Sequence, residues 1–327
     1  MNNMSKSNSW LTIDRLNGMG NATVALTASE LSTIGERNLT IKVNTLTKSS
    51  EINVLQKFYE EPLIPENIPN NQIWAKSTDG SEIAFNVDIY DFDFNVSLID
   101  KQLRSDGWNI FTFDGDVPYL QSKRFFNKTN VQEVVLPNSI SSIQFSAFEG
   151  CTSLTSIKFP DNITDIEARA FQKCTSLTSI NLPDNITYIG YNAFEKCQSL
   201  TSINLPDRLN KINNEVFSGC SSLTSIIIPD NVTSIGYASF SECSSLASIE
   251  FGSGLTYIGS SAFNSCIGLN EMKFKGVTAP RYESNTFRGI KRDGVFYYPS
   301  GSDYSSLLRW QGDVFNLGYY NWTSVPY

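Results

Sequence analysis

The sequence predicts a mixed fold, in which an N-terminal β-sandwich is followed by a solenoid of short repeats. Cysteine recurs every 23 residues from Cys151 to Cys266, and phenylalanine, leucine and isoleucine recur in columns of the same period. A unit of this length cannot bury its own apolar edge, but stacked copies bury their edges against one another. In such a solenoid, parallel strands are expected on the concave face, and short helical or irregular turns on the convex face.

Four segments are predicted along the chain. They are the β-sandwich at 8–60, a linker and capping segment at 61–112, the solenoid at 113–290 and a C-terminal cap at 291–327. Alternating apolar residues around Leu26, Ile41 and Val54, punctuated by glycines, predict the strands of the sandwich. Prolines at the start of the second segment indicate an extended linker. The rest of that segment is expected to cover the open end of the first coil.

Each repeat is predicted to form a strand, a turn and a segment that faces inward. The unit that begins at Leu177 opens with alternating apolar and polar residues, which is typical of a half-buried strand. Pro183 ends the strand because proline cannot donate to a strand ladder. The segment Ile189–Cys197 then places Ala193 and Phe194 on one side at helical spacing, which predicts a helical turn facing inward.

The last coil also needs a cover, because a solenoid exposes an apolar edge at each end. A last strand is predicted at Val295–Pro299, followed by a short helix between Ser302 and Trp310. Aromatic residues here either close the last coil or form an exposed binding patch; they are Trp310, Phe315, Tyr319, Tyr320 and Trp322.

The composition excludes several classes of function. Histidine is absent, which excludes Ser-His-Asp and Cys-His catalysis and every histidine-ligated metal site. The 33 acidic and 25 basic residues give a net charge of −8, without the basic footprint of a nucleic-acid-binding protein. No apolar stretch is long enough to span a membrane, and Met1–Ser9 lacks the apolar region of a signal peptide. No phosphate-binding loop is present. We therefore expect no catalytic residue, no cofactor and no metal ion.

The six cysteines allow two interpretations. They are Cys151, Cys174, Cys197, Cys220, Cys243 and Cys266. Neighbours in one column would lie within reach of a disulfide bond, and export would favour oxidation. A free cysteine surrounded by phenylalanine, leucine and isoleucine behaves instead as a small apolar side chain, so the sequence favours a buried, reduced column. No C-x-x-C pair exists to hold zinc.

The repeat resembles the BspA-like leucine-rich repeats of bacterial surface proteins over about residues 113–280. The strand that ends in Leu-Pro, the Ile-Gly step at Ile189 and Gly190, the Ala-Phe pair and the cysteine column all agree. Two departures, Lys128 in place of a cysteine and Gly252 in place of a proline, mark repeats near the ends. The strand order within 8–60 resembles a BACON domain, an immunoglobulin-like module common in exported Bacteroidetes proteins.

The resemblance implies a non-enzymatic protein that is exported to the cell surface or outside the cell. It implies adhesion to a macromolecular partner, a protein or a glycan, through an extended leucine-rich-repeat face; we expect a monomer that binds no nucleic acid. One alternative is a glycan-binding surface protein that acts through the β-sandwich. Another is a hydrolase that depends on carboxylates, although no carboxylate pair lies in a motif that fixes its partner.

Two sets of residues are candidates for contact with a partner. On the concave face, outward-pointing positions of the strands form hydroxyl-rich columns, which either suit stacked strands or form a binding surface. They are Thr155, Ser156, Lys158, Thr178, Ser179, Asn181, Thr201, Ser202, Asn204, Thr224, Ser225, Ile227, Ser248, Glu250, Glu271 and Lys273. The second set consists of tyrosines beyond the turn, a residue type favoured at interfaces; they are Tyr188, Tyr191, Tyr237 and Tyr257.

Overall fold

The computed structural model describes residues 68–84, 96–308 and 317–327 and, nearer the N-terminus, the backbone of four strands. The chain forms two compact units, Met1–Pro65 and Glu66–Tyr327. In the first unit, antiparallel pairs join β1 (Leu11–Ile13) to β2 (Leu26–Ala28) and β3 (Arg37–Asn44) to β4 (Ser49–Gln56). The predicted strands around Leu26, Ile41 and Val54 are therefore present. The packing of a β-sandwich, and with it a BACON domain, lies outside the described residues.

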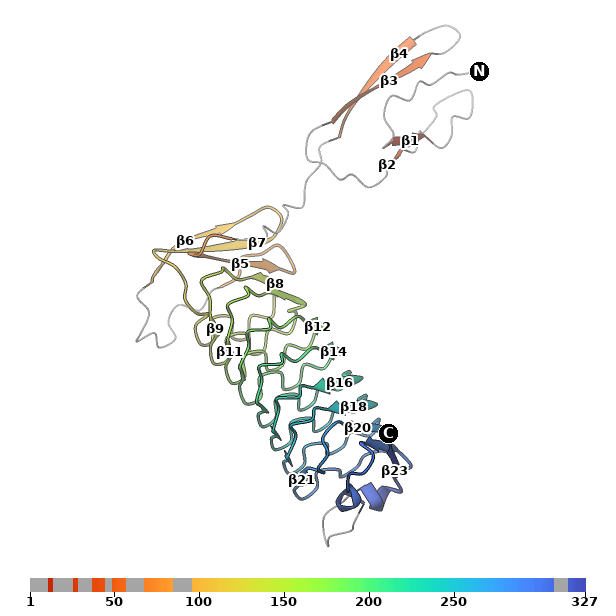
Figure 1. The fold of residues 1–327 in the computed structure, drawn as a ribbon. Coiled ribbons are helices and arrows are strands. Elements are labelled where there is room, and N and C mark those ends of the chain that lie inside the picture. Colours follow the sequence, from red (N-terminus) through yellow and green to blue (C-terminus); the bar gives the residue numbers. More distant parts are fainter. Residues whose placement is uncertain are drawn as a thin grey trace. The chain divides into compact units, whose positions relative to one another are not determined.

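The second unit opens with an antiparallel sheet that continues into the first coil (Figure 1). Its strands, in the order β10-β8-β5-β7-β6, are β10 (Ser156–Lys158), β8 (Val131–Val135), β5 (Gln72–Ser77), β7 (Trp108–Phe113) and β6 (Leu98–Leu103). Strand β8 pairs in parallel with β10 and antiparallel with β5. The backbone edge of the first coil is thus covered by β5, as an exposed edge strand requires.

Beyond this sheet the chain is a β-solenoid, in which parallel strands of successive coils stack in two ladders (Figure 1). The first ladder continues from β8 and β10 through β12 (Ser179–Ile180), β14 (Ser202–Ile203), β16 (Ser225–Ile228), β18 (Ser248–Phe251), β20 (Glu271–Phe274), β22 (Val295–Tyr298) and β23 (Thr323–Pro326). The second consists of β9 (Ser142–Ile143), β11 (Asp165–Ile166), β13 (Tyr188–Ile189), β15 (Lys211–Ile212), β17 (Ser234–Ile235), β19 (Tyr257–Ile258) and β21 (Arg281–Tyr282).

The segment after the second ladder forms turns, so the predicted helical turn over Ile189–Cys197 is wrong. Asn192 and Lys196 each have a φ of 58°, and this left-handed conformation interrupts a right-handed helix. The amide of Phe194 donates to the carbonyl of Val216 in the next coil at 2.9 Å rather than back along its own segment. Ala193, Phe194 and Cys197 still point inward, because the turns give them the same side as a helix would.

The C-terminus differs from the prediction in its last strand. The predicted strand at Val295–Pro299 is present as β22, but it is not the last, because β23 pairs with it in parallel. Two short 3-10 helices, η1 (Ser305–Leu307) and η2 (Leu317–Tyr320), lie between them in the chain. Tyr320 and Trp322 are buried, as a cap requires. Trp310 and Phe315 lie outside the described residues, and so does the side chain of Tyr319.

A continuous ladder of phenylalanine rings fills the interior. Rings one coil apart are stacked, with centroids 5.2 to 5.9 Å apart and interplanar angles of 3° to 17°; the column is Phe125, Phe148, Phe171, Phe194, Phe217, Phe240, Phe263 and Phe287. All eight side chains are fully buried. Each coil therefore covers the aromatic edge of its neighbour, which is the prediction that the 23-residue period makes.

The cysteines form a second buried column beside the rings. All six are free and buried. Each thiol donates a hydrogen bond to the backbone carbonyl of the phenylalanine 26 residues earlier, with S···O distances of 2.9 to 3.2 Å. This arrangement supports a buried, reduced cysteine column over a series of disulfide bonds, since every sulfur already has a backbone partner.

Gly190→Ala is expected to lower the free energy of unfolding by about 1–3 kcal/mol, which is the usual cost of overpacking. A Cβ at Gly190 would lie 2.4 Å from the amide nitrogen of Ala168, so the two coils would have to separate locally. Urea unfolding measures the loss. The exposed neighbour offers a control, since Tyr191→Ala should change the same free energy by at most about 0.5 kcal/mol. Equal losses in the two variants would contradict close contact between these coils.

Candidate partner-binding face

The outward side of the first ladder, here called the strand face, consists of the residues that alternate with its buried isoleucines. In β12 and β14, Ile180 and Ile203 point inward, so Ser179 and Ser202 point outward in register with each other. Further along, Ile227 pairs with Glu250, and Glu250 pairs with Lys273. The structure thus brings the predicted concave-face residues together on one surface. All are exposed except Ser248, Glu250 and Lys273, which are partly buried.

Threonines on this face take part in holding the coils together. The hydroxyl of Thr155 donates to the carbonyl of Gln132 at 3.1 Å, and that of Thr201 donates to the carbonyl of Thr178 at 3.1 Å. Thr224 repeats the contact with the carbonyl of Thr201 at 3.3 Å. For the threonine column, these bonds favour the simpler of the two interpretations, a ladder suited to stacked strands.

The column two residues beyond the serines is the one that changes its chemistry from coil to coil. It contains Lys158, Asn181, Asn204, Ile227, Glu250 and Lys273. Parallel pairing places these residues at the spacing of neighbouring strands, roughly 5 Å. A partner that lies along this column would meet a cation, two amides, an apolar group and then an ion pair, on a backbone that is the same in every coil.

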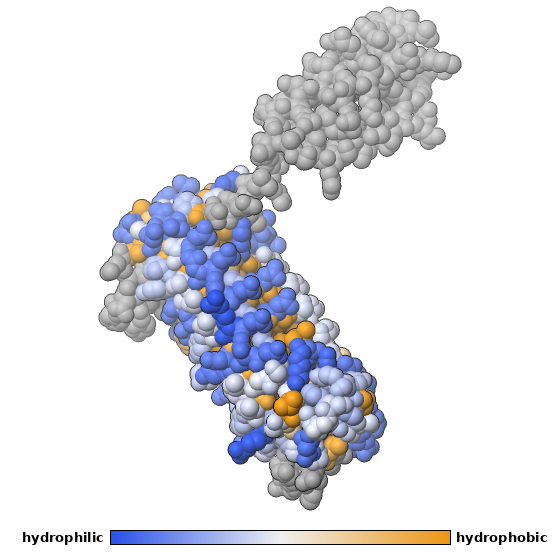
Figure 2. Space-filling model, viewed as in Figure 1, coloured by the Kyte–Doolittle hydropathy of each residue, from blue (hydrophilic) through white to orange (hydrophobic). Residues whose placement is uncertain are grey.

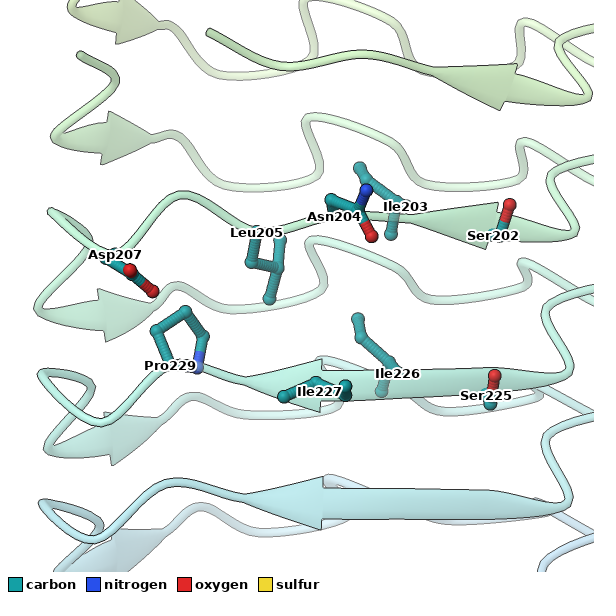
Figure 3. Close-up of a pocket in the computed structure, with 9 residues that line it drawn as sticks. All are labelled: Ser202, Ile203, Asn204, Leu205, Asp207, Ser225, Ile226, Ile227 and Pro229. Atoms are coloured by element: carbon teal, nitrogen blue, oxygen red, sulfur yellow. The ribbon is translucent and has the colours of Figure 1, made fainter. Parts of the chain in front are cut away.

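A shallow pocket of about 300 Å³ lies at the middle of the strand face. Its walls come from two neighbouring coils, as Figure 3 shows: Ser202, Ile203, Asn204, Leu205 and Asp207 from one, and Ser225, Ile226, Ile227 and Pro229 from the next. Ile227 is 61% exposed. The visible face of the repeat unit is mainly polar with scattered apolar side chains (Figure 2). An exposed isoleucine that lines a pocket is a candidate anchor for a partner.

An ion-pair cluster marks the C-terminal part of the strand face. The carboxylate of Glu250 lies 2.7 Å from the Nζ of Lys275 and 3.3 Å from the Nζ of Lys273. The hydrogen bond from Lys275 is the main reason why the pKa of Glu250 lies below its usual value. The ammonium of Lys273 also lies 5.5 Å from the centre of the Tyr327 ring. The face therefore ends in charges that already have partners.

Three residues of this region were not among the predicted contacts. Lys275 reaches Glu250 from the residue after β20, Tyr297 lies beside Lys273 in β22, and Tyr327 packs at the end of β23. Tyr297 follows Lys273 by one repeat with one inserted residue, so the repeat period could have predicted its place on the strand face. No repeat pattern points to Tyr327, because it follows the irregular cap.

The predicted tyrosines lie on the second ladder and the turn that follows it. Tyr188 and Tyr257 begin β13 and β19, and Tyr257 is 38% exposed. Tyr191 and Tyr237 come three residues after the corresponding strands begin, with exposures of 47% and 49%. They form a surface separate from the strand face, since they belong to the other ladder.

Within 68–84, 96–308 and 317–327, no three histidine, cysteine or acidic residues are grouped so that they could hold a metal ion. In the same part of the chain, no helix has the length and apolar character needed to cross a membrane.

Comparison with known proteins identifies the repeats. The family described as the BspA type leucine-rich repeat region matches residues 118–224 and 210–300, in six copies. Two similar solved structures are leucine-rich repeat proteins. The one from Bacteroides ovatus is 24% identical over 67% of this chain and 70% of its own, with a TM-score of 0.47. The one from Eubacterium ventriosum is 23% identical over 57% and 49%, with a TM-score of 0.48.

A leucine-rich cell surface protein from Faecalibacterium prausnitzii is also similar, at 24% identity over 55% of this chain and 63% of its own, with a TM-score of 0.31. No curated protein matches this chain.

Proposed function

We propose that this chain, which belongs to the BspA-type leucine-rich repeat family, is a non-enzymatic binding protein of the bacterial cell surface that contacts a partner protein through its strand face. Leucine-rich repeat proteins of this kind are typically surface proteins that mediate protein interactions, and their solenoids are typically non-enzymatic. The adhesive role and the export of this chain are the parts of the proposal that go beyond the family.

The observation that carries the proposal is the combination of a constant backbone with a varied outer column. Serine and threonine repeat from coil to coil, whereas the positions of Asn204, Ile227 and Glu250 each present a different group. Specific binding needs such differences, and the stacked coils fix their relative positions, which lowers the entropic cost of association. Ile227 provides exposed apolar area in a pocket whose lining is about equally polar and apolar, and an apolar anchor beside polar groups is common at protein interfaces.

Ile227→Arg is expected to weaken binding to the partner about 30-fold or more, because it replaces an apolar anchor by a charge at the centre of the face. The full chain would first be tested against a panel of immobilised extracellular-matrix and bacterial surface proteins. The dissociation constant of the strongest binder would then be measured by surface plasmon resonance for both proteins.

Asn210→Arg serves as the matched control, since it adds the same charge at an exposed position just before β15 on the second ladder. Its dissociation constant should stay within about twofold of the original. If both variants bind as the unchanged chain does, or if both lose binding equally, the strand face is not the binding site.

A further inference from the structure

Aromatic side chains recur on the second side of the solenoid at every other coil. Phe145, Tyr191 and Tyr237 are each separated by two repeats and follow their strands at the same position. They are 38%, 47% and 49% exposed. We call this column, together with the neighbouring Tyr188 and Tyr257, the tyrosine strip.

The spacing of the strip follows from the stack. Successive coils pair in parallel and in register beside it, as Asp165 does with Tyr188 and Ser234 with Tyr257. Two coils correspond to roughly 10 Å. Tyr191 and Tyr237 are therefore two exposed rings about 10 Å apart on stacked coils, with one coil between them.

The residues between the rings are small and uncharged. Ala168, Asn214 and Ser260 occupy the intervening coils of the column that contains Tyr191 and Tyr237. Asn214 is held in place, because its Oδ1 accepts the amide hydrogen of Tyr237 at 2.9 Å. Among the described residues its Nδ2 has no hydrogen-bond partner, so the strip offers a donor between two rings.

The charges of the second side lie beside this column rather than in it. Asp165 and Glu167 lie near Tyr188, Lys211 follows in the next coil, and Arg281 and Glu283 lie near Tyr257. The guanidinium of Arg169 lies 5.8 Å from the centre of the Phe145 ring, so the open part of the strip begins at Tyr191. A column without charge on a chain of net charge −8 is complementary to an uncharged polar ligand.

We propose that the tyrosine strip binds a neutral, β-1,4-linked glycan chain that lies along the solenoid axis. Such a chain is an extended ribbon whose repeating unit is a disaccharide, so the apolar C–H face of every second pyranose recurs along one straight line. A periodic ligand can meet a periodic row of rings at each repeat, which the irregular surface of a folded protein does not do. The faces of Tyr191 and Tyr237 would stack on alternate sugars, and the Nδ2 of Asn214 would donate to a hydroxyl between them.

Isothermal titration calorimetry on the full chain tests this with cellobiose, cellotetraose and cellohexaose. Affinity should increase from the disaccharide to the tetrasaccharide, because at least three sugars are needed to reach both Tyr191 and Tyr237, and it should change little from the tetrasaccharide to the hexasaccharide. The Tyr191→Ala/Tyr237→Ala double variant should bind cellohexaose about tenfold more weakly or not at all. Maltohexaose, an α-linked chain of equal length, should not bind, because its helical path takes successive sugar faces off the line.

Ile227→Arg separates this site from the strand face and should leave the affinity for cellohexaose unchanged. Thermal unfolding of the double variant checks that it is folded. The assignment is overturned if cellohexaose does not bind, if maltohexaose binds equally well, or if the double variant binds as the unchanged chain does. It is also overturned if the two tyrosines prove necessary for a protein partner while no glycan binds.

Discussion

Phe194→Ala is expected to lower the free energy of unfolding by about 3–5 kcal/mol, the range for truncation of a buried phenylalanine. The side chain is fully buried, and its ring stacks on Phe171 at 5.3 Å and on Phe217 at 5.7 Å. The substitution therefore removes contacts to both neighbouring coils at once. Because coils are stable only through their neighbours, a weak coil in the middle also lowers the cooperativity of the whole stack.

Urea unfolding followed by circular dichroism measures this change through the midpoint and the slope of the transition. Phe194→Leu keeps most of the apolar volume and should lose less than half as much stability. If Phe194→Ala lost less than about 1 kcal/mol, the column of rings would not be a packed core and the solenoid would be wrong. A broadened transition would indicate that the two halves unfold separately.

The buried columns were predictable from the sequence because they depend only on the period. Phenylalanine recurs from Phe125 to Phe287 and cysteine from Cys151 to Cys266, and any fold that stacks equivalent units must place equivalent residues together. Burial requires an apolar residue at these positions in the inner coils, so the pattern is strong there. The same reasoning predicted that Asn204 and Ile227 would share a face, since they alternate with buried isoleucines. Their role in binding stays a prediction.

The turns could not be predicted in the same way. The left-handed positions are occupied by Asn192 and Lys196 in one coil, and by Ala238 and Glu242 in another, residue types that have no common preference for this conformation. What stabilises them is a set of backbone hydrogen bonds to the next coil, such as Phe194 to Val216, which is invisible within one repeat. The inward residues have helical spacing in the sequence, but the segment that holds them forms turns and not a helix.

Side-chain contacts between coils could not be predicted from the sequence either. The pairing of Glu250 with Lys275 depends on side-chain conformation, and neither residue recurs with the period. The strand that brings Tyr327 onto Lys273 follows a cap with no repeat pattern. For the N-terminal β-sandwich, alternation located the strands, but a sheet-on-sheet arrangement depends on long-range contacts, and it stays a prediction.

The stability of the solenoid is expected to fall steeply between pH 8.5 and pH 11, because six thiols are buried as neutral groups. Burial raises the pKa of the Cys151 thiol to about 12 and that of Cys197 to about 12, and it raises the others in the same direction. In the unfolded chain a thiol has a pKa of about 8.5. Below that value both states hold the proton, and the full stability is present.

Above it, the unfolded chain releases protons that the folded chain retains, so the free energy of unfolding decreases as the pH rises. Each thiol contributes a loss of up to about 1.4 kcal/mol per pH unit, and the losses from the six thiols add in the same direction. Urea midpoints at pH 8, 9 and 10 measure this slope. Cys197→Ala should make it shallower by about 1.4 kcal/mol per pH unit, although the variant starts from a lower stability at pH 8 because it leaves a small cavity.

The same burial gives an independent test by thiol labelling. An aromatic disulfide reagent at pH 8 should react with none of the six thiols in the folded protein and with all six in urea, because each sulfur is buried and donates to a phenylalanine carbonyl. Rapid labelling without denaturant, together with a flat dependence of stability on pH, would mean that the column lies open to solvent. The stacked core would then have to be abandoned, because Phe194 and Cys197 line the same interior.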